Sequence, residues 1–175
     1  MQPVLPLTHP FTLFHTVLSL VAILAGLVVA RGMLRNHPMP GWTTLFLSTA
    51  VLTTATGFLF PFRGFTPALG TGVVSSGVLA LTLIALYAQR LAGGWRAVYV
   101  VGAMVSVYLN VFVLVVQLFQ KVPALHALAP TQKEPPFAIA QGVVLVVFVV
   151  ATVLAVRRFH PGASGVAPAA VRNPS

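Results

Sequence analysis

Long runs of apolar residues alternate along this chain with short segments that contain polar residues, proline and glycine. The runs cover five ranges, residues 11–30, 42–60, 69–88, 97–119 and 137–156. Each is close to the roughly 20 residues that a helix needs to cross the hydrocarbon core of a membrane. Runs this long and this evenly apolar do not resemble the alternating strands of a membrane barrel. The pattern therefore predicts an all-α membrane protein, a bundle of five transmembrane helices.

The longest polar segment, "KVPALHALAPTQKEPPF" at residues 121–137, separates the fourth and fifth runs. Pro123 is suited to the first turn of a helix, so "PALHALA" is expected to form a short extracytoplasmic surface helix before the last span. Residues 1–161 are expected to form a single transmembrane domain. Residues 162–175 are mostly small residues and proline and are expected to form a flexible cytoplasmic tail.

The composition supports the membrane interpretation and excludes several function classes. Charged residues make up 6% of the chain, against about 25% in soluble domains. The net charge of +9 does not indicate a nucleic-acid partner, because the basic residues lie singly or in pairs between apolar runs. The chain has no cysteine, which excludes disulfides, thiolate metal sites and iron–sulfur clusters.

The basic residues predict an orientation. Five spans would place Arg31, Arg35, Arg90, Arg96, Arg157, Arg158 and Arg172 on one side, and Arg63, Lys121 and Lys133 on the other. Cytoplasmic loops carry the excess of Lys and Arg. The N-terminus is therefore expected outside and the C-terminus in the cytoplasm.

The fourth run carries a stripe of polar residues. At 100° per residue a narrow arc contains Tyr99, Ser106, Asn110, Gln117 and Lys121. One interpretation is the wall of a polar cavity that opens outward near Gln117 and Lys121. The alternative, the commoner role of such groups, is hydrogen bonding between helices. In the second run Thr49, Thr53 and Thr56 share a face that is expected to pack, with hydroxyls bonded to their own helix backbone.

Histidines offer a second kind of chemistry. His15 is the ionisable residue deepest within a run, and the spacing of Ala22 and Gly26 on its face allows close helix approach. An imidazole in the bundle could ligate haem or a metal, with His126 as a weak second candidate. It could equally hydrogen-bond a loop. Nothing in the spacing of the histidines specifies a metal site.

Enzymatic function is disfavoured by the acidic residues. Glu134 is the only Asp or Glu in the chain, so catalysis by paired carboxylates is excluded within it. Lys133, Lys121 and Arg63 are expected on the same side as Glu134 and are candidate partners for its charge.

The stretch "LNVFVLVVQLFQKVPALHALAPTQKEPPF" resembles sequences of a family of small, uncharacterised bacterial inner-membrane proteins. The likeness extends through "FHTVLSLVAILAGLVVARGMLRN" and much of the chain. It implies a bacterial inner-membrane location and adds no catalytic residue.

These observations favour a non-enzymatic integral membrane protein with an outward-facing pocket for a small molecule, a lipid or a partner subunit. Its predicted lining is His15, Asn110, Gln117, Lys121, His126 and Glu134. One alternative is a redox membrane protein that holds haem b or a quinone. Another is a permease-like transporter that works as a homo-oligomer. The lipid bilayer is the predicted partner of all three.

Overall fold

The computed structural model describes residues 8–60 and 67–161, and every regular element within them is helical. In chain order the elements are α1 (Thr8–Leu34), α2 (Pro40–Gly57), α3 (Pro67–Leu83), the π-helical turn η1 (Ile84–Ala88), α4 (Trp95–Lys121), α5 (Pro123–Leu128) and α6 (Pro135–Arg158). The predicted all-α class is confirmed. The structure does not describe Arg63, Arg172 or the predicted tail at residues 162–175, nor the side chain of His9.

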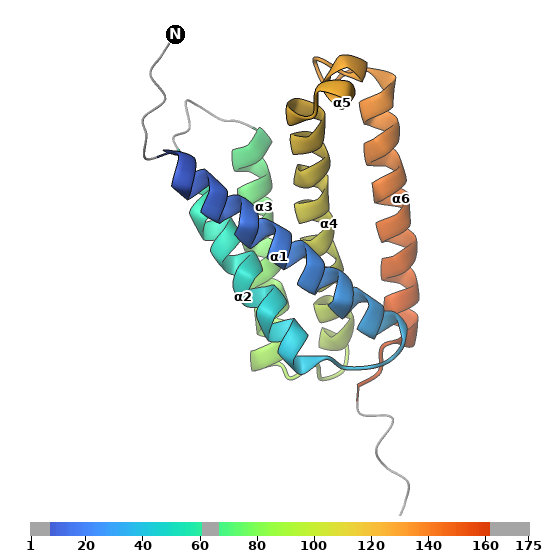
Figure 1. Cartoon of the computed structure of the whole chain (residues 1–175). Helices are drawn as coiled ribbons and strands as arrows, with labels where there is room; N and C mark the ends of the chain where they lie inside the picture. Colours follow the sequence, from blue (N-terminus) through green and yellow to red (C-terminus); the bar gives the residue numbers. More distant parts are fainter. Residues whose placement is uncertain (1–7, 61–66, 162–175) are drawn as a thin grey trace, which may run out of the picture.

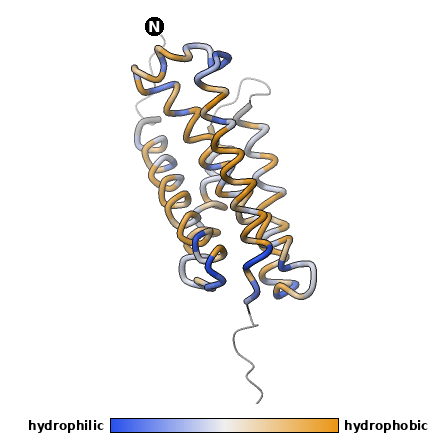
Figure 2. The backbone as a smooth tube through the Cα atoms, turned by 90° about the vertical axis from the view of Figure 1, so that its right-hand side faces the viewer, coloured by the Kyte–Doolittle hydropathy of each residue, from blue (hydrophilic) through white to orange (hydrophobic). Residues whose placement is uncertain are grey.

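Within the described residues, four helices are long and apolar enough to cross a membrane: Pro10–Leu34, Leu69–Ala88, Trp95–Lys121 and Pro135–Arg158. They indicate a multi-pass membrane protein. Hydrophobic residues cover the middle of the bundle, and hydrophilic residues gather at its two ends (Figure 2). The second predicted span corresponds to α2, which is 18 residues long and rich in threonine, and it is not among these four. A fifth span therefore stays a prediction.

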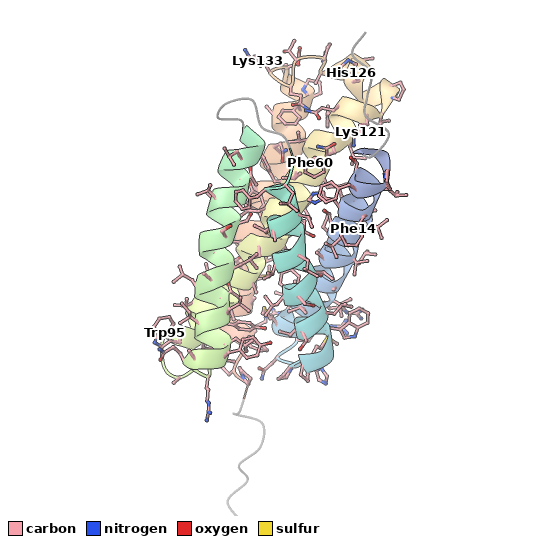
Figure 3. The ribbon with its side chains drawn as sticks, turned by 90° about the vertical axis from the view of Figure 1, so that its left-hand side faces the viewer. Phe14, Phe60, Trp95, Lys121, His126 and Lys133 are labelled. Carbon is pink, nitrogen blue, oxygen red and sulfur yellow. The ribbon has the colours of Figure 1, made fainter. Side chains whose placement is uncertain are left out.

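The basic residues that the structure describes lie at the two ends of the bundle, with arginines at one end and lysines at the other. The C-terminal ends of α1 and α6 lie with the N-terminal ends of α2 and α4 (Figure 1). These ends carry Arg31, Arg35, Arg96, Arg157 and Arg158. Lys121, His126 and Lys133 lie at the other end, far from Trp95 (Figure 3).

The α1–α2 hairpin crosses the α4–α6 pair obliquely (Figure 1). The crossing is close at Gly26, where an added Cβ would lie 2.6 Å from Cγ2 of Val107 and 2.9 Å from Cε2 of Phe46. Only a residue without a side chain permits this approach. Ala22, its neighbour one turn earlier, is also fully buried.

The hydrophobic core occupies the half of the bundle nearer the arginines. Its fully buried large side chains include Met33, Phe46, Val100, Met104 and Val107. Arg96 holds this end together by donating to the carbonyl oxygens of Val156 (2.8 Å) and Phe159 (2.6 Å). Val156 belongs to the last turn of α6, and Phe159 directly follows the helix. The backbone N–H of His160 donates to Oδ1 of Asn36 at 2.7 Å. Beyond the crossing at Gly26, α1 diverges from α4 (Figure 1), and the opposite half of the bundle, which holds few of the buried core residues, is less tightly packed.

Candidate functional site

A cavity of about 610 Å³ lies in this less tightly packed half, enclosed by α1, α2, α3 and α4. Much of its wall is apolar, including Leu20, Ile23, Leu69, Leu109, Val113, Leu114, Leu118 and the rings of Phe58 and Phe60. Polar groups interrupt that wall on every helix, among them His15, Ser19, Thr53, Ser75, Asn110, Gln117 and Lys121. Binding sites for small molecules have this size range and this mixture of an apolar lining with few polar groups.

His15 is held in the wall by Thr56 of α2, whose Oγ1 lies 2.8 Å from Nδ1 of the imidazole. The Thr56 hydroxyl also donates to the carbonyl oxygen of Leu52 at 2.7 Å. A hydroxyl has one proton, and both contacts are hydrogen bonds only if Nδ1 is the donor to Thr56. With the Thr56 proton on the Leu52 carbonyl, a neutral His15 donates from Nδ1 and carries its lone pair on Nε2. The ring of Phe60 packs edge-on against the imidazole, with centroids 5.2 Å apart.

The polar stripe of α4 divides into two parts. Tyr99 and Ser106 are buried in the core, and the Ser106 hydroxyl donates to the carbonyl oxygen of Gly102 at 2.8 Å. Asn110, Gln117 and Lys121 line the cavity. Nδ2 of Asn110 donates to the carbonyl oxygen of Ser106 at 2.9 Å, while its Oδ1 has no partner among the described residues. The hydrogen bonds of Ser106 and Asn110 both stay within α4, so neither of them joins two helices, and the part of the stripe from Asn110 to Lys121 lines the cavity.

Gln117 and Lys121 lie one turn apart near the end of α4. Neither side chain makes a hydrogen bond or an ion pair within the part of the chain that the structure describes. An unpaired amide and an unpaired ammonium at the wall of a cavity can bind a polar group of a ligand. Lys121 is exposed and marks the mouth, at the same end as His126 and Lys133 (Figure 3).

Thr53 is a member of the site that the sequence did not reveal. Its side chain is 9% exposed, and its hydroxyl oxygen has no partner among the described residues. Buried hydroxyls without a partner are uncommon and costly. The threonine face of α2 was expected only to pack, and Thr49 does so, donating to the carbonyl oxygen of Leu45 at 2.7 Å. Thr53 instead lines the cavity, and Thr56 holds His15 in its wall. Both roles depend on the position of α1 beside α2, which the sequence does not give.

His126 and Glu134 do not line the cavity. His126 is exposed on α5 at the end of the bundle. The Glu134 carboxylate accepts hydrogen bonds from the hydroxyl of Thr131 (2.8 Å), its N–H (3.2 Å) and the N–H of Lys133 (3.0 Å). No Lys or Arg of the described residues forms an ion pair with it. The extended backbone before Pro135 directs this side chain back into its own loop.

These hydrogen bonds set the acidity of Glu134. Desolvation acts to raise the pKa of its carboxyl, but the hydrogen bonds from the Thr131 hydroxyl and from nearby backbone N–H groups together outweigh it. The pKa therefore lies below its ordinary value, and the group is ionised at neutral pH.

The described residues contain no group of three or more His, Asp or Glu side chains that could hold a metal ion. His15 and His126 are not brought together, because one lines the cavity and the other lies exposed on α5. Among the described histidines, His15 is the lining residue that would hold a haem iron in this cavity.

Comparison with known protein families, with curated proteins and with solved structures finds no match to this chain. The chemistry of the site therefore has to be inferred from its own geometry.

Proposed function

We propose that this chain is a non-enzymatic, multi-pass protein of the bacterial inner membrane that binds a small amphiphilic molecule in the cavity between α1, α2, α3 and α4. The observation that carries the proposal is a volume of about 610 Å³ with an apolar wall and with two polar groups, Gln117 and Lys121, that have no partner in the described structure. A ligand with an apolar body and a polar head would fill the volume, and its head would bind these two groups.

The proposal includes α2 as a fifth span. Its 18 residues rise about 27 Å, close to the roughly 30 Å thickness of the hydrocarbon core. Its hydroxyl groups are what lower its hydropathy. Several of them donate to the carbonyl oxygen one turn earlier in the same helix, including those of Thr44, Ser48, Thr49, Thr54 and Thr56. A hydroxyl satisfied in this way is less costly to place in lipid.

The distribution of basic residues supports an N-terminus outside and a C-terminus in the cytoplasm. Arginines gather at the ends of α1 and α6 and at the start of α4, whereas the other end of the bundle has Lys121 and Lys133 among its described residues. By the excess of Lys and Arg in cytoplasmic loops, the cavity mouth and α5 would face outward. The apolar face of α6, where Ile139, Val143 and Val146 are each more than half exposed, would contact lipid or a second membrane subunit.

A redox function is the second candidate, and the geometry of His15 favours it. With Nδ1 donating to Thr56, the lone pair of Nε2 is available to a haem iron or to the hydroxyl of a quinol. One histidine from the wall would supply a single protein ligand to the iron.

Purification in a mild detergent, followed by native mass spectrometry and an absorption spectrum, separates the two candidates. The amphiphile proposal predicts a colourless protein with a bound small molecule. A Soret band that disappears in His15→Ala would establish haem instead. Protein that is free of any bound molecule and that binds no amphiphile added later would contradict the proposed function.

A further inference from the structure

Lys121 carries a positive charge at the mouth of the cavity that nothing in the described structure balances. It ends α4, lines the cavity, and has no ion pair within residues 8–60 and 67–161. The only acid of the chain is Glu134, and its carboxylate is occupied by Thr131 and by the N–H of Lys133. No side-chain carboxylate of the described residues therefore pairs with Lys121.

The strongest uncommitted hydrogen-bond donors of the cavity wall, an ammonium and an amide, lie at its mouth. Several hydroxyls of the wall already donate to backbone carbonyls, namely Thr16 to Thr12 (2.8 Å), Ser19 to His15 (2.8 Å) and Thr54 to Ala50 (2.9 Å). The amide of Gln117 and the ammonium of Lys121 are uncommitted and lie one turn apart at the mouth. The mouth therefore offers donors and positive charge, which is the environment that an anionic head group requires.

The wall away from the mouth suits a hydrocarbon chain. Asn110 lies eleven residues before Lys121 on α4, a rise of about 16 Å. Between and opposite these two residues the cavity is lined by Leu20, Ile23, Val113 and Leu114. A volume of about 610 Å³ is within the roughly 300–1,000 Å³ of pockets for single small molecules. It fits one chain better than the two chains of a bilayer phospholipid.

We infer that the cavity selects a single-chain amphiphile with an anionic head, of the fatty-acid class, whose head binds Lys121 and Gln117 at the mouth and whose chain lies along α4 and α1. This inference rests on the proposed function and adds the chemical class of the ligand to it. No covalent step is involved.

Binding of palmitate, hexadecanol and an anionic two-chain phosphatidylglycerol to the detergent-solubilised protein tests the inference. Palmitate and hexadecanol have the same chain length and differ in the charge of the head. We expect palmitate to bind more tightly than hexadecanol. Lys121→Gln should weaken the binding of palmitate by about three- to tenfold, as for loss of a partly solvated charge-assisted hydrogen bond. It should leave the binding of hexadecanol unchanged.

Two matched variants make the result specific. Lys121→Arg keeps the charge and should retain palmitate binding. Lys133→Gln removes a lysine at the same end that does not line the cavity, and it should also bind palmitate normally. Both variants report on folding as well, because their unaltered binding requires an intact bundle.

The outcomes separate this inference from the proposed function. Equal binding of palmitate and hexadecanol, unaffected by Lys121→Gln, would overturn the anionic head and leave the amphiphile site standing. Tighter binding of phosphatidylglycerol than of palmitate would overturn the single-chain class. Failure of all three lipids to bind would contradict both this inference and the proposed function.

Discussion

Nδ1 of His15 lies 2.8 Å from Oγ1 of Thr56, and this hydrogen bond joins α1 to α2 in the wall of the cavity. It fixes the orientation of the imidazole. When Thr56 donates to the carbonyl oxygen of Leu52, Nδ1 of a neutral His15 is the donor to Thr56. The two helices diverge from α4 at this level. A hydrogen bond here holds α1 and α2 together, as buried apolar side chains do at the other end of the bundle.

Replacing Thr56 by valine removes this contact while keeping the shape of the side chain. We expect the free energy of unfolding to fall by about 1–2 kcal/mol, because Nδ1 of a half-buried imidazole loses its acceptor. Thermal unfolding in detergent, followed by circular dichroism, measures the change. Thr44→Val is the control, since Thr44 bonds only to its own helix on an exposed face. Equal effects of the two substitutions would show that the contact between α1 and α2 contributes nothing.

Gly26→Ala tests the close crossing of α1 over α4. The new Cβ would lie 2.6 Å from Val107 and 2.9 Å from Phe46, so we expect a loss of about 1–3 kcal/mol of stability from overpacking. Gly77→Ala is the matched control in α3, where an added Cβ meets no atom within 4 Å. The control should be neutral or stabilising by up to about 1 kcal/mol, as for Gly to Ala in a helix. Two substitutions of equal effect would be incompatible with the packing described at the crossing.

The lowered pKa of Glu134 predicts that the folded protein loses stability at acidic pH. Its pKa is lowered in the folded protein, so its contribution is complete above the ordinary pKa and is lost as the pH falls through the folded value. The wild-type protein should therefore lose stability as the pH is lowered from about 5 to 3, where carboxyls titrate. In Glu134→Gln, which has no side-chain carboxyl left in the sequence, this part of the dependence should be absent. Thermal unfolding across this pH range decides the matter, and parallel curves for the two proteins would refute the assignment.

The orientation can be read with a reporter enzyme that is active only outside the cytoplasm. Fused after Lys133, in the loop between α5 and α6, it should be active, and fused after Arg158 it should be silent. Together the two fusions establish whether α6 crosses the membrane and in which direction. The reverse pattern would overturn the proposed topology and place the cavity mouth in the cytoplasm.

The apolar runs of the sequence predict the positions of the helices well. The first helix was expected from residue 11 and begins at Thr8, and the last was expected over 137–156 and runs from Pro135 to Arg158. Proline explains the second difference, because Pro135 and Pro136 stand in the first turn, where their missing N–H groups are tolerated. The turn η1 was not expected. Its N–H···O bond from Gln89 to Ile84, at 2.9 Å, is a local adjustment that apolar periodicity does not encode.

The site is less accessible to sequence reasoning, because its formation depends on how the helices cross. Helical periodicity was enough to place Asn110, Gln117 and Lys121 on one face, and the structure brings all three, with His15, to one cavity. It gave no means of knowing that Glu134 bonds to its own loop, because that depends on backbone angles at residues 131–134. Thr53 and Thr56 gain their roles from α1, a neighbour whose crossing angle is set at Gly26.

The most direct test of the account compares two neighbouring substitutions of α3, Ser75→Phe and Ser76→Phe. Ser75 lines the cavity, whereas Ser76 is exposed on the adjoining face of the helix and does not line it. Native mass spectrometry after addition of palmitate measures the bound fraction of each protein. The account predicts that Ser75→Phe, whose ring occupies part of the cavity, binds less palmitate than Ser76→Phe, which binds it as the wild type does. Equal binding by the two variants would show that the ligand does not occupy this cavity and would contradict the central claim.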